Sequence, residues 1–408
     1  MKTEIRQRIE QIRRGEIPAG YKKTKAGIVP LEWKESRFKF LFNRINRKNN
    51  EGNTNVLTIS AQHGLINQED FFHKTIASDD KSNYFLLYRG DFAYNKSYSS
   101  GYPFGALKRL DRYDKGIVSP LYICFSANKE NKCPDFYLHY FESGKLNSEI
   151  QAVAQEGARN HGLLNISIDD FFNSVILVPP LHEQQRIVEI LSTQDKVIEL
   201  YEKKIEQLQL LKKVCLQKMF PKQGSNVPEV RFPDFTEPWE QRKLEEEISS
   251  VDTGKSKYVA SNSGKYEILG STSVIGYDNT YDYEGNFLLT ARVGANAGQL
   301  YRHSGKVKIT DNTVFIQGNQ LDFIYCALIH FDLHKLSFGT GQPLVKASEL
   351  KKLILSIPCA QSEKEQIGSF FQTFDHLITL HQRQLDEEKR KKKALMQLLL
   401  TGIMRVEI

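Results

Sequence analysis

The chain has 408 residues, of which 40% are hydrophobic, and a formal net charge of +7. This length is enough for two hydrophobic cores, and no apolar run approaches the roughly 18 residues of a membrane-spanning helix. The charged first residues lack the apolar core of a signal peptide, and the five cysteines form no CxxC pair. We therefore expect a cytoplasmic protein with reduced cysteines. The ten histidines show no metal-ligand spacing, so we expect no metal site.

The N-terminal segment carries Ile5, Ile9 and Ile12 at helical spacing. This pattern predicts a short helical arm over residues 1–17. We expect the arm to pack near the C-terminus, and a free arm is the alternative.

From residue 18 onwards the chain contains the same pattern twice. Each copy has a tryptophan close after a proline, a long mixed segment, a short polar helix, an apolar strand ended by proline, and a long helix. The tryptophans are Trp33 and Trp239, and the prolines are Pro179 and Pro358. A repeat of this length implies two copies of a whole folding unit. Positions 180 apart in the long helices are identical at Glu183/Glu363, Ile187/Ile367, Thr193/Thr373, Asp195/Asp375, Ile198/Ile378, Leu200/Leu380, Lys212/Lys392, Lys213/Lys393 and Gln217/Gln397.

This order predicts the domain boundaries. They are a helical arm (1–17), a first globular domain (18–178), a central helix (179–221), a linker (222–238), a second globular domain (239–357) and a C-terminal helix (358–408).

The long helices carry apolar residues at alternating steps of three and four, which is typical of a coiled-coil seam. We expect the helices to pack through Ile187, Leu191, Ile198, Tyr201, Ile205 and Leu208 of the first and Ile367, Phe371, Phe374, Ile378 and Leu385 of the second. Glu388 and Lys391 interrupt the second seam, so we expect its far end to be only partly packed. The basic run over residues 389–393 follows three acidic residues, which favours a solvated helix face over a partner contact.

Both globular domains mix basic, amide and aromatic residues in loops that contain glycine. The loops over residues 94–102 and 290–299 follow matching strand entries at Gly90 and Gly285, so we expect them to occupy equivalent places. Such side chains can reach phosphates and base edges. The alternative is that the glycines only shape hairpins and that Arg292 and Lys96 are solvated surface residues. The candidate DNA-binding residues are Asn95, Lys96, Ser97, Tyr98, Lys255, Lys257, Arg292, Asn296, Gln299 and Gln342.

The motifs assembled so far resemble the specificity (S) subunits of type I restriction-modification systems. The resemblance covers nearly the whole chain. It rests on Pro179-Pro180-Leu181 with the following residues 183–187, on a degenerate copy at 358–367, and on the segments that lead into Trp33 and Trp239. It implies an α+β fold in which two α/β target recognition domains are separated by two long antiparallel coiled-coil helices, as a pseudo-twofold internal repeat.

The resemblance also implies function and partners. Each target recognition domain would read one half of an asymmetric bipartite site in double-stranded DNA. Two modification (methyltransferase) subunits and the restriction (translocase-nuclease) subunits would supply adenine-N6 methylation and ATP-dependent cleavage. S-adenosylmethionine, ATP and Mg are expected in those partners, and no cofactor in this chain. Residues 359–362 depart from the family pattern at the second helix, which leaves the docking surface of that half open.

The residues themselves indicate no catalytic site. A methyltransferase needs an Asn or Asp-Pro-Pro-aromatic tetrad, whereas Val178 precedes Pro179-Pro180 and Leu181 follows. Thr253-Gly254-Lys255-Ser256 imitates a phosphate-binding loop but lacks its first glycine. We therefore expect a recognition subunit without catalysis of its own. Two alternatives stay open: a specificity subunit of another restriction type, and a coiled-coil scaffold that binds no DNA.

Overall fold

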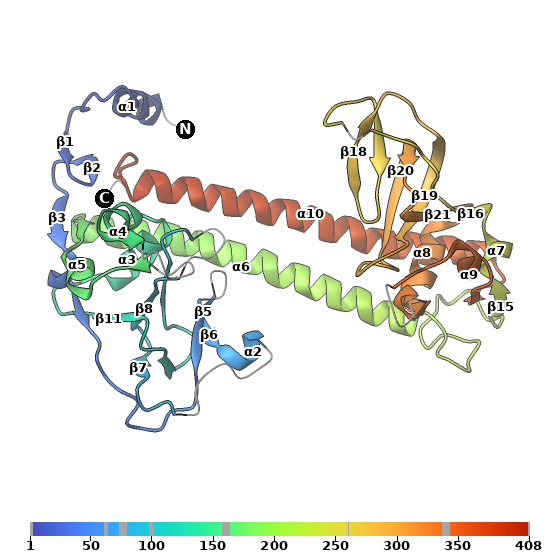
Figure 1. Ribbon diagram of the computed structural model, residues 1–408, viewed down its shortest axis with the longest axis horizontal. Helices are drawn as coiled ribbons and strands as arrows, with labels where there is room; N and C mark the ends of the chain where they lie inside the picture. Colours follow the sequence, from blue (N-terminus) through green and yellow to red (C-terminus); the bar gives the residue numbers. More distant parts are fainter. Residues whose placement is uncertain are drawn as a thin grey trace. The chain divides into compact units, whose positions relative to one another are not determined.

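The computed structural model describes residues 3–60, 64–72, 80–97, 102–156, 164–259, 261–336 and 343–406 (Figure 1). The chain divides into two compact units: unit 1 with residues 1–199 and 386–408, and unit 2 with residues 200–385. The boundary crosses both long helices, α6 (Leu181–Lys218) and α10 (Gln361–Leu399), so each unit holds a globular part and a portion of each helix. No helix among the described residues is long and apolar enough to cross a membrane.

Unit 1 combines short strands with short helices. In chain order its elements are α1 (Thr3–Arg13), β1 (Tyr21–Thr24), β2 (Gly27–Pro30), β3 (Lys34–Arg37), η1 (Phe38–Phe40), β4 (Phe42–Arg44), β5 (Leu57–Ser60), β6 (Gly64–Asn67), α2 (Gln68–Phe72), β7 (Phe85–Tyr88), β8 (Phe92–Asn95), β9 (Ala106–Arg109), β10 (Lys115–Val118), β11 (Ile123–Ala127), α3 (Pro134–Glu142), α4 (Asn147–Val153), β12 (Gln155–Glu156), β13 (Leu164–Asn165), α5 (Ile168–Asn173) and β14 (Val175–Val178). The main sheet has the order β4-β11-β8-β9 and is antiparallel throughout. The pair β3-β14 joins the start of the domain to the strand that leads into α6.

Unit 2 is built around a larger sheet. Its elements are β15 (Glu240–Lys243), α7 (Leu244–Glu247), β16 (Ser250–Thr253), β17 (Tyr266–Leu269), β18 (Val274–Asp278), β19 (Tyr283–Ala291), β20 (Leu300–Ile309), β21 (Thr313–Gln317), α8 (Leu321–Phe331), η2 (Leu333–Leu336), α9 (Ala347–Lys351) and β22 (Ile354–Ile357). The six-stranded sheet has the order β16-β21-β19-β20-β17-β18, in which only β17 and β20 run parallel. The pair β15-β22 leads into α10.

The two units repeat one topology. The order β4-β11-β8-β9 in unit 1 corresponds to β16-β21-β19-β20 in unit 2, and β3-β14 corresponds to β15-β22. Helices α3 and α8 follow the corresponding strands β11 and β21, and they bury residues at the same spacing. These residues are Phe136, Tyr137, His139, Tyr140 and Phe141 in α3, and Phe323, Ile324, Cys326, Ala327 and Leu328 in α8.

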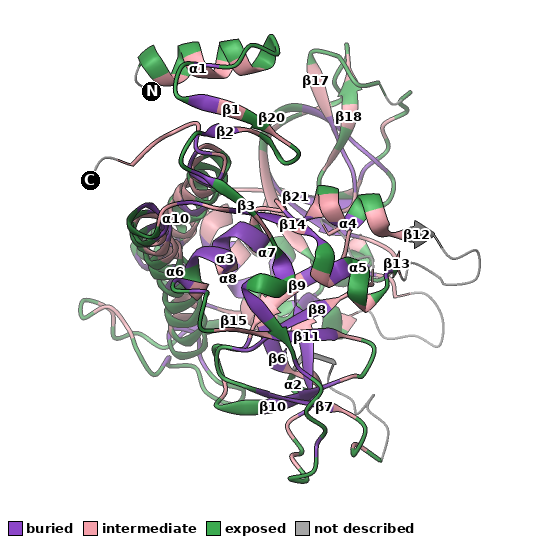
Figure 2. Cartoon of the chain, turned by 90° about the vertical axis from the view of Figure 1, so that its left-hand side faces the viewer, coloured by how far each residue is buried: buried purple, intermediate pink, exposed green. Residues whose placement is uncertain are grey.

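Each unit has its own hydrophobic core. In unit 1 the ring of Phe38 lies 4.5 Å from that of Phe42 and 4.8 Å from that of Phe125, measured between centroids. In unit 2 aliphatic residues such as Val314 and Ile316 fill the corresponding sheet. Helix α1 buries no residue and is green and pink in Figure 2, in contrast to the buried strands. The core of unit 1 is therefore formed by the globular domain and the adjoining ends of α6 and α10, without α1.

Helices α6 and α10 have 38 and 39 residues, which corresponds to about 57 Å each. Most of the expected seam residues are buried, whereas Ile198, Tyr201 and Ile378 are half-buried. The far end of α10 also enters the core of unit 1, where Met396, Leu399 and the following Leu400 are buried. That this end packs only partly against the first long helix stays a prediction. The buried seam residues are Ile187, Leu191, Ile205, Leu208, Ile367, Phe371, Phe374 and Leu385.

Polar residues of the two seams pair with each other, which explains why the interrupted seam still packs. The amide of Gln194 donates to the carboxylate of Glu388, and Lys391 lies 3.3 Å from the same carboxylate. Each of these three polar seam residues thus has a partner, either in the other helix or one turn away in its own helix. A buried polar group costs little free energy when its hydrogen bonds are satisfied.

The same ion pair between the helices recurs in each unit. Lys212 of α6 pairs with Asp375 of α10, and Lys392 of α10 pairs with Asp195 of α6 at 2.6 Å. Because the four residues are two of the identical pairs in the repeat, the same contact forms twice. Lys392 also lies 2.8 Å from Glu142 of α3, and its side chain is only 13% exposed. The interpretation of the basic run as a solvated face was therefore wrong for Lys392.

His139 completes this charged cluster. It is buried, and its Nδ1 lies 3.9 Å from Asp195 and 4.0 Å from Glu142 without a hydrogen-bond partner among the described residues. The three residues bring ligand-type atoms close together, as a metal site would. The ammonium of Lys392 contacts both carboxylates, so an internal cation already offsets part of their negative charge.

Each long helix begins with a buried carboxylate that binds a tryptophan and an arginine. Glu183 accepts a hydrogen bond from the indole Nε1 of Trp33 at 2.8 Å and two from the guanidinium of Arg405 at 2.9 and 3.2 Å. Both Glu183 and its counterpart Glu363 are 1% exposed and lie in the first helical turn, where the helix dipole favours a negative charge. We call this arrangement the Trp-Glu-Arg clamp.

The second clamp has the same parts. Glu363 accepts from the indole of Trp239 at 3.2 Å and from Arg231 at 2.7 and 2.8 Å. Arg231 comes from the segment after α6, and Arg405 comes from the segment after α10. The C-terminal segment therefore supplies the arginine of the first clamp, and the linker supplies the arginine of the second.

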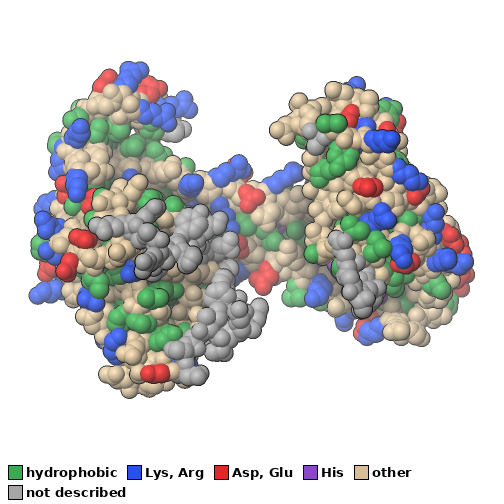
Figure 3. All heavy atoms as spheres, viewed as in Figure 1, with side chains coloured by type: hydrophobic (Ala, Val, Ile, Leu, Met, Phe, Trp, Pro, Cys, Tyr) green, Lys and Arg blue, Asp and Glu red, His purple; other side chains and the backbone are tan. Residues whose placement is uncertain are grey.

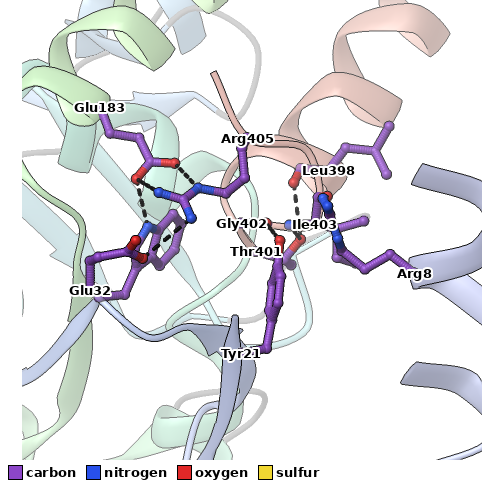
Figure 4. Close-up of polar contacts among 10 residues, drawn as sticks. Arg8, Tyr21, Glu32, Glu183, Leu398, Thr401, Gly402, Ile403 and Arg405 are labelled. Carbon is purple, nitrogen blue, oxygen red and sulfur yellow. Dashed lines mark hydrogen bonds and ion pairs between the residues drawn. The ribbon is translucent and has the colours of Figure 1, made fainter. Parts of the chain in front are cut away.

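The N-terminal arm and β1 contact Ile403 and Gly402, in the segment that follows α10 and carries Arg405 (Figure 4). Arg8 of α1 donates to the carbonyl of Ile403, and its guanidinium lies 5.1 Å from the ring centroid of Tyr21. The hydroxyl of Tyr21 donates to the carbonyl of Gly402 at 2.6 Å. The arm thus packs near the C-terminus, as its sequence predicts.

Replacing Glu183 with Ala should destabilise the protein by about 3 kcal/mol, because it leaves the buried indole N–H and the Arg405 guanidinium without their acceptor. Glu189 on the same helix is a matched control, since its side chain is 63% exposed and pairs only with Arg186. Glu189→Ala should change the free energy of unfolding by about 0.5 kcal/mol or less. Urea denaturation measures both, and equal losses would contradict a special role for the clamp.

The buried His139 should make stability depend on pH. Burial lowers the pKa of His139 below its ordinary value of 6.5 despite the nearby Asp195. The unfolded chain therefore binds a proton at His139 more readily than the folded chain does. The free energy of unfolding is at its full value above pH 6.5 and decreases as the pH falls below it. His139→Cys, which introduces the residue found at the equivalent position 326, should flatten this slope. An unchanged slope in urea titrations at pH values around 6 would contradict the prediction.

Candidate nucleic-acid interface

The hairpin between β19 and β20 carries three of the predicted DNA-binding residues. Asn296 and Gln299 are exposed, and Arg292 is half-buried. Gly294 and Gly298 adopt φ of +87° and +92°, and a Cβ at position 298 would lie 2.9 Å from the backbone of Leu333. Glycine is therefore required for this turn. The hairpin is a shaped loop whose polar side chains face solvent.

Arg292 is held at the base of this hairpin. Its backbone N–H donates to the carbonyl of Asn312 at 2.9 Å, and its guanidinium donates to the carbonyl of Asp311 at 3.1 Å. Its own carbonyl accepts from Val345. A guanidinium has five donors, so one hydrogen bond leaves others for a ligand.

The segment after β16 carries Lys255 and Lys257, which are both exposed. Its backbone is fixed by hydrogen bonds from Gly254 to Thr313 and from Ser256 to Ile309. A side chain at position 254 would collide with the carbonyl of Ile309 at 2.4 Å, so this strand approaches its neighbour closely. Lys255 lies 3.3 Å from Asp252, but both groups are largely exposed and the pair is weak.

Both segments contact the short turn over residues 310–312. Lys255 and Lys257 flank Ser256, which bonds to Ile309 just before this turn, and Arg292 bonds to Asp311 and Asn312 within it. Residues that are about 40 positions apart in the sequence therefore gather around one turn in unit 2.

The corresponding hairpin of unit 1 lies between β8 and β9. The structure places Lys96 and Ser97 there, half-buried. The amide of Asn95 is engaged locally, since it accepts from the N–H of Ser97 at 3.1 Å and donates to the hydroxyl of Tyr122 at 3.3 Å. Tyr98 of this loop and Gln342 of unit 2 lie outside the described residues. DNA contact by all ten residues stays a prediction.

Three exposed tyrosines of unit 2 escaped the sequence analysis. Tyr258, Tyr277 and Tyr281 are 37–40% exposed, and the ammonium of Lys306 lies 4.7 Å from the ring centroid of Tyr281. Tyr277 N–H donates to the carbonyl of Ser261, which brings β18 next to the segment that carries Lys257. These tyrosines follow no helical or strand periodicity in the sequence. Only the structure shows that they are exposed and that Tyr277 pairs with the distant Ser261.

Charge by itself does not delimit the interface. On the face seen in Figure 3, Lys and Arg side chains are dispersed over each unit, with Asp and Glu between them. Hairpin position is a better guide, because β8-β9 and β19-β20 are equivalent strand pairs in the two sheets.

Comparison with known proteins identifies the family to which this architecture belongs. A family model described as the type I restriction modification DNA specificity domain matches residues 30–210 and 236–389. The chain belongs to this family. The MjaVIII specificity subunit of Methanocaldococcus jannaschii is 27% identical over 329 residues, which cover 72% of this chain and 75% of that protein. The putative MjaX specificity subunit of the same organism is 23% identical, over 95% of this chain and 97% of that protein.

Solved structures share the fold of this specificity subunit. The S subunit of a type I restriction-modification system from M. genitalium has a TM-score of 0.59 and 15% identity, over 92% of this chain and 97% of that one. A chain from a study of complex assembly in the type I system has a TM-score of 0.53 and 16% identity, over 92% and 99%. The predicted fold class, with two mixed domains and two long helices, is confirmed.

Proposed function

We propose that this specificity subunit selects the DNA sequence on which a type I restriction-modification complex acts. It reads an asymmetric bipartite site in double-stranded DNA and directs adenine-N6 methylation and ATP-dependent cleavage by partner subunits. The observation that carries the proposal is that two units of one strand order each present a polar hairpin at the same place in the sheet, with different sequences.

The equivalent hairpins argue for two readers of different sequence. The two hairpins follow equivalent strands of their sheets, whereas the polar side chains they carry differ: Asn95, Lys96 and Ser97 in one, Arg292, Asn296 and Gln299 in the other. Since base edges are distinguished by the donors and acceptors offered to them, different side chains select different bases. The target is therefore asymmetric.

The repeated frame supports two equivalent partners. The Trp-Glu-Arg clamp and the Lys–Asp pair occur once in each unit, so each unit offers the same supporting structure to a partner. We assign one modification subunit to each half, and restriction subunits to the complete complex. S-adenosylmethionine, ATP and Mg belong to these partners, and this chain contributes recognition without catalysis.

Arg292→Ala should weaken or relax recognition of one half-site only, because Arg292 belongs to one hairpin. A lost bidentate contact to a base costs about 1–3 kcal/mol of discrimination. Sequencing of methyladenine in cells that carry each variant measures the motif. Asn296→Ala, at an exposed position of the same loop, tests whether loop contacts other than Arg292 matter. Equal loss at both halves would contradict the model of two readers.

The length of the helices should set the spacer between the half-sites. Inserting one heptad into α6 after Tyr201 and one into α10 after His381 keeps the seam in phase, because the rings of these residues lie 6.0 Å apart. We expect the spacer to grow by about 10 Å, or about three base pairs.

The heptad in α6 alone is the control, since it shifts Lys212 away from Asp375 and should impair folding instead of changing the motif. An unchanged spacer in the double insertion would contradict the proposal. Methyladenine mapping in strains with and without the gene supplies the reference motif, and the purified chain alone is expected to methylate no DNA.

A further inference from the structure

The outer edge of strand β14 in unit 1 is closed by side chains. The N–H of Val175 donates to the carboxylate of Glu149 at 2.8 Å, and the N–H of Leu177 donates to the hydroxyl of Tyr140 at 3.3 Å. The hydroxyl of Tyr137 donates to the carbonyl of Leu177 at 3.4 Å. Helices α3 and α4 thus satisfy the backbone groups that face away from β3.

The corresponding edge in unit 2 belongs to β22. The bond from Leu244 N–H to the carbonyl of Leu353 makes Leu355 and Ile357 the residues bonded to β15, since hydrogen-bonded pairs alternate in antiparallel strands. Ile354 and Ser356 therefore direct their N–H and C=O groups outward. Within the parts of unit 2 that the structure describes, no hydrogen bond closes these groups.

A substitution and a missing helix leave this edge open. Ala327 of α8 stands at the position of Tyr140, and Ile324 stands at that of Tyr137, as the matching burial patterns of α3 and α8 show. No described helix of unit 2 corresponds to α4, which supplies Glu149, because α8 is followed by the short η2. Among the described residues of unit 2, no side-chain hydroxyl or carboxylate is hydrogen-bonded to the outward N–H and C=O groups of β22.

A groove of about 890 Å³ lies along this edge. It is lined by Ile354, Leu355 and Ser356 of β22, by Ala327 and His330 of α8, and by the segment over residues 220–226. Ile354 is 57% exposed, although it is a large apolar residue. Lys222 and Lys335 line the groove, and no carboxylate lines it among the described residues. Lys222 also lies 3.2 Å from Glu229 outside the groove, but both groups are largely exposed, so this pair is weak.

We propose that this groove binds an extended, acidic segment of a partner polypeptide, which adds as a third strand beside β22. Two outward N–H groups and two outward C=O groups on alternate residues match the backbone of another strand. Ile354 offers an apolar contact for alternate side chains, and the two lysines complement negative charge. Duplex DNA fits less well, because phosphates bring acceptors but no donors for the strand carbonyls. The proposal stands independently of DNA recognition by the hairpins.

Ser356→Pro tests the edge directly. It removes one outward N–H and leaves the bonds of Leu355 and Ile357 to β15 in place. Because the hydroxyl of Ser356 also accepts from Gln241 at 2.6 Å, Ser356→Ala is the matched control that loses this contact but keeps the N–H. Ala327→Tyr restores the side chain found at the equivalent position 140, whose hydroxyl accepts from the N–H of Leu177. It should therefore close the groove without changing any residue of β22.

The probes are short, blocked, fluorescein-labelled peptides of alternating Val and Glu, with alternating Val and Lys as the charge control. Fluorescence anisotropy on the full chain should show binding of the Glu peptide and weaker binding of the Lys peptide. Ser356→Pro and Ala327→Tyr should each weaken the Glu peptide about tenfold, whereas Ser356→Ala should not. Hydrogen exchange at the Ser356 amide should slow when this peptide is added.

Failure of the Glu peptide to bind the wild-type chain would overturn the proposal, as would equal affinity for wild type and both blocking variants. Loss of duplex DNA binding in Ser356→Pro, with no peptide bound to wild type, would assign the groove to nucleic acid instead. Thermal melts check folding. If Ser356→Pro fails to fold, Ala327→Tyr alone decides the outcome.

Discussion

The buried carboxylate at the start of each long helix is the contact on which the rest of each unit depends. Glu183 and Glu363 join three parts that are distant in sequence: the tryptophan that opens a domain, the helix that follows it, and an arginine from the segment after the other helix. A buried charge is tolerated only when it is paired and hydrogen-bonded, so all three parts must be present together. The clamp therefore couples the domain, the helix start and the arginine segment into one cooperative unit.

The frame and the reading loops obey different physical constraints. Clamps, interhelical ion pairs and strand order repeat because they must satisfy the same buried groups in both units. In the hairpin after β19, Gly294 and Gly298 shape the turn while Asn296 and Gln299 are exposed, so the core does not dictate these two polar side chains. Specificity can therefore differ between the units while the frame stays the same. The units also differ at one strand edge. In unit 1, Tyr140 of α3 and Glu149 of the extra helix α4 close the edge of β14, whereas the corresponding edge of β22 in unit 2 is open.

Internal charges are matched within each unit instead of being left to solvent. Lys392 lies between Glu142 and Asp195, and Lys212 pairs with Asp375, which in turn contacts Arg302. These clusters tie α3 or β20 to the long helices, so they set the orientation of each globular domain on its own helix portions. Their free energy is modest for each pair, but the geometry they impose is specific.

The sequence by itself determined the repeat, the two domains, the long helices and most of the seam, because helical spacing and identity at a fixed offset can be recognised without knowing which parts meet. It left open whether the N-terminal arm packs, which the contact of Arg8 with Ile403 decided. It also singled out the two tryptophans and the two glutamates without pairing them. Only the tertiary structure decided that Arg405 completes the first clamp, that Lys392 is buried, that Ser261 pairs with Tyr277 of β18, and that Ala327 lines a groove. These contacts join residues far apart in the chain, and no periodic pattern records which of many charged or aromatic residues will meet once the core has packed.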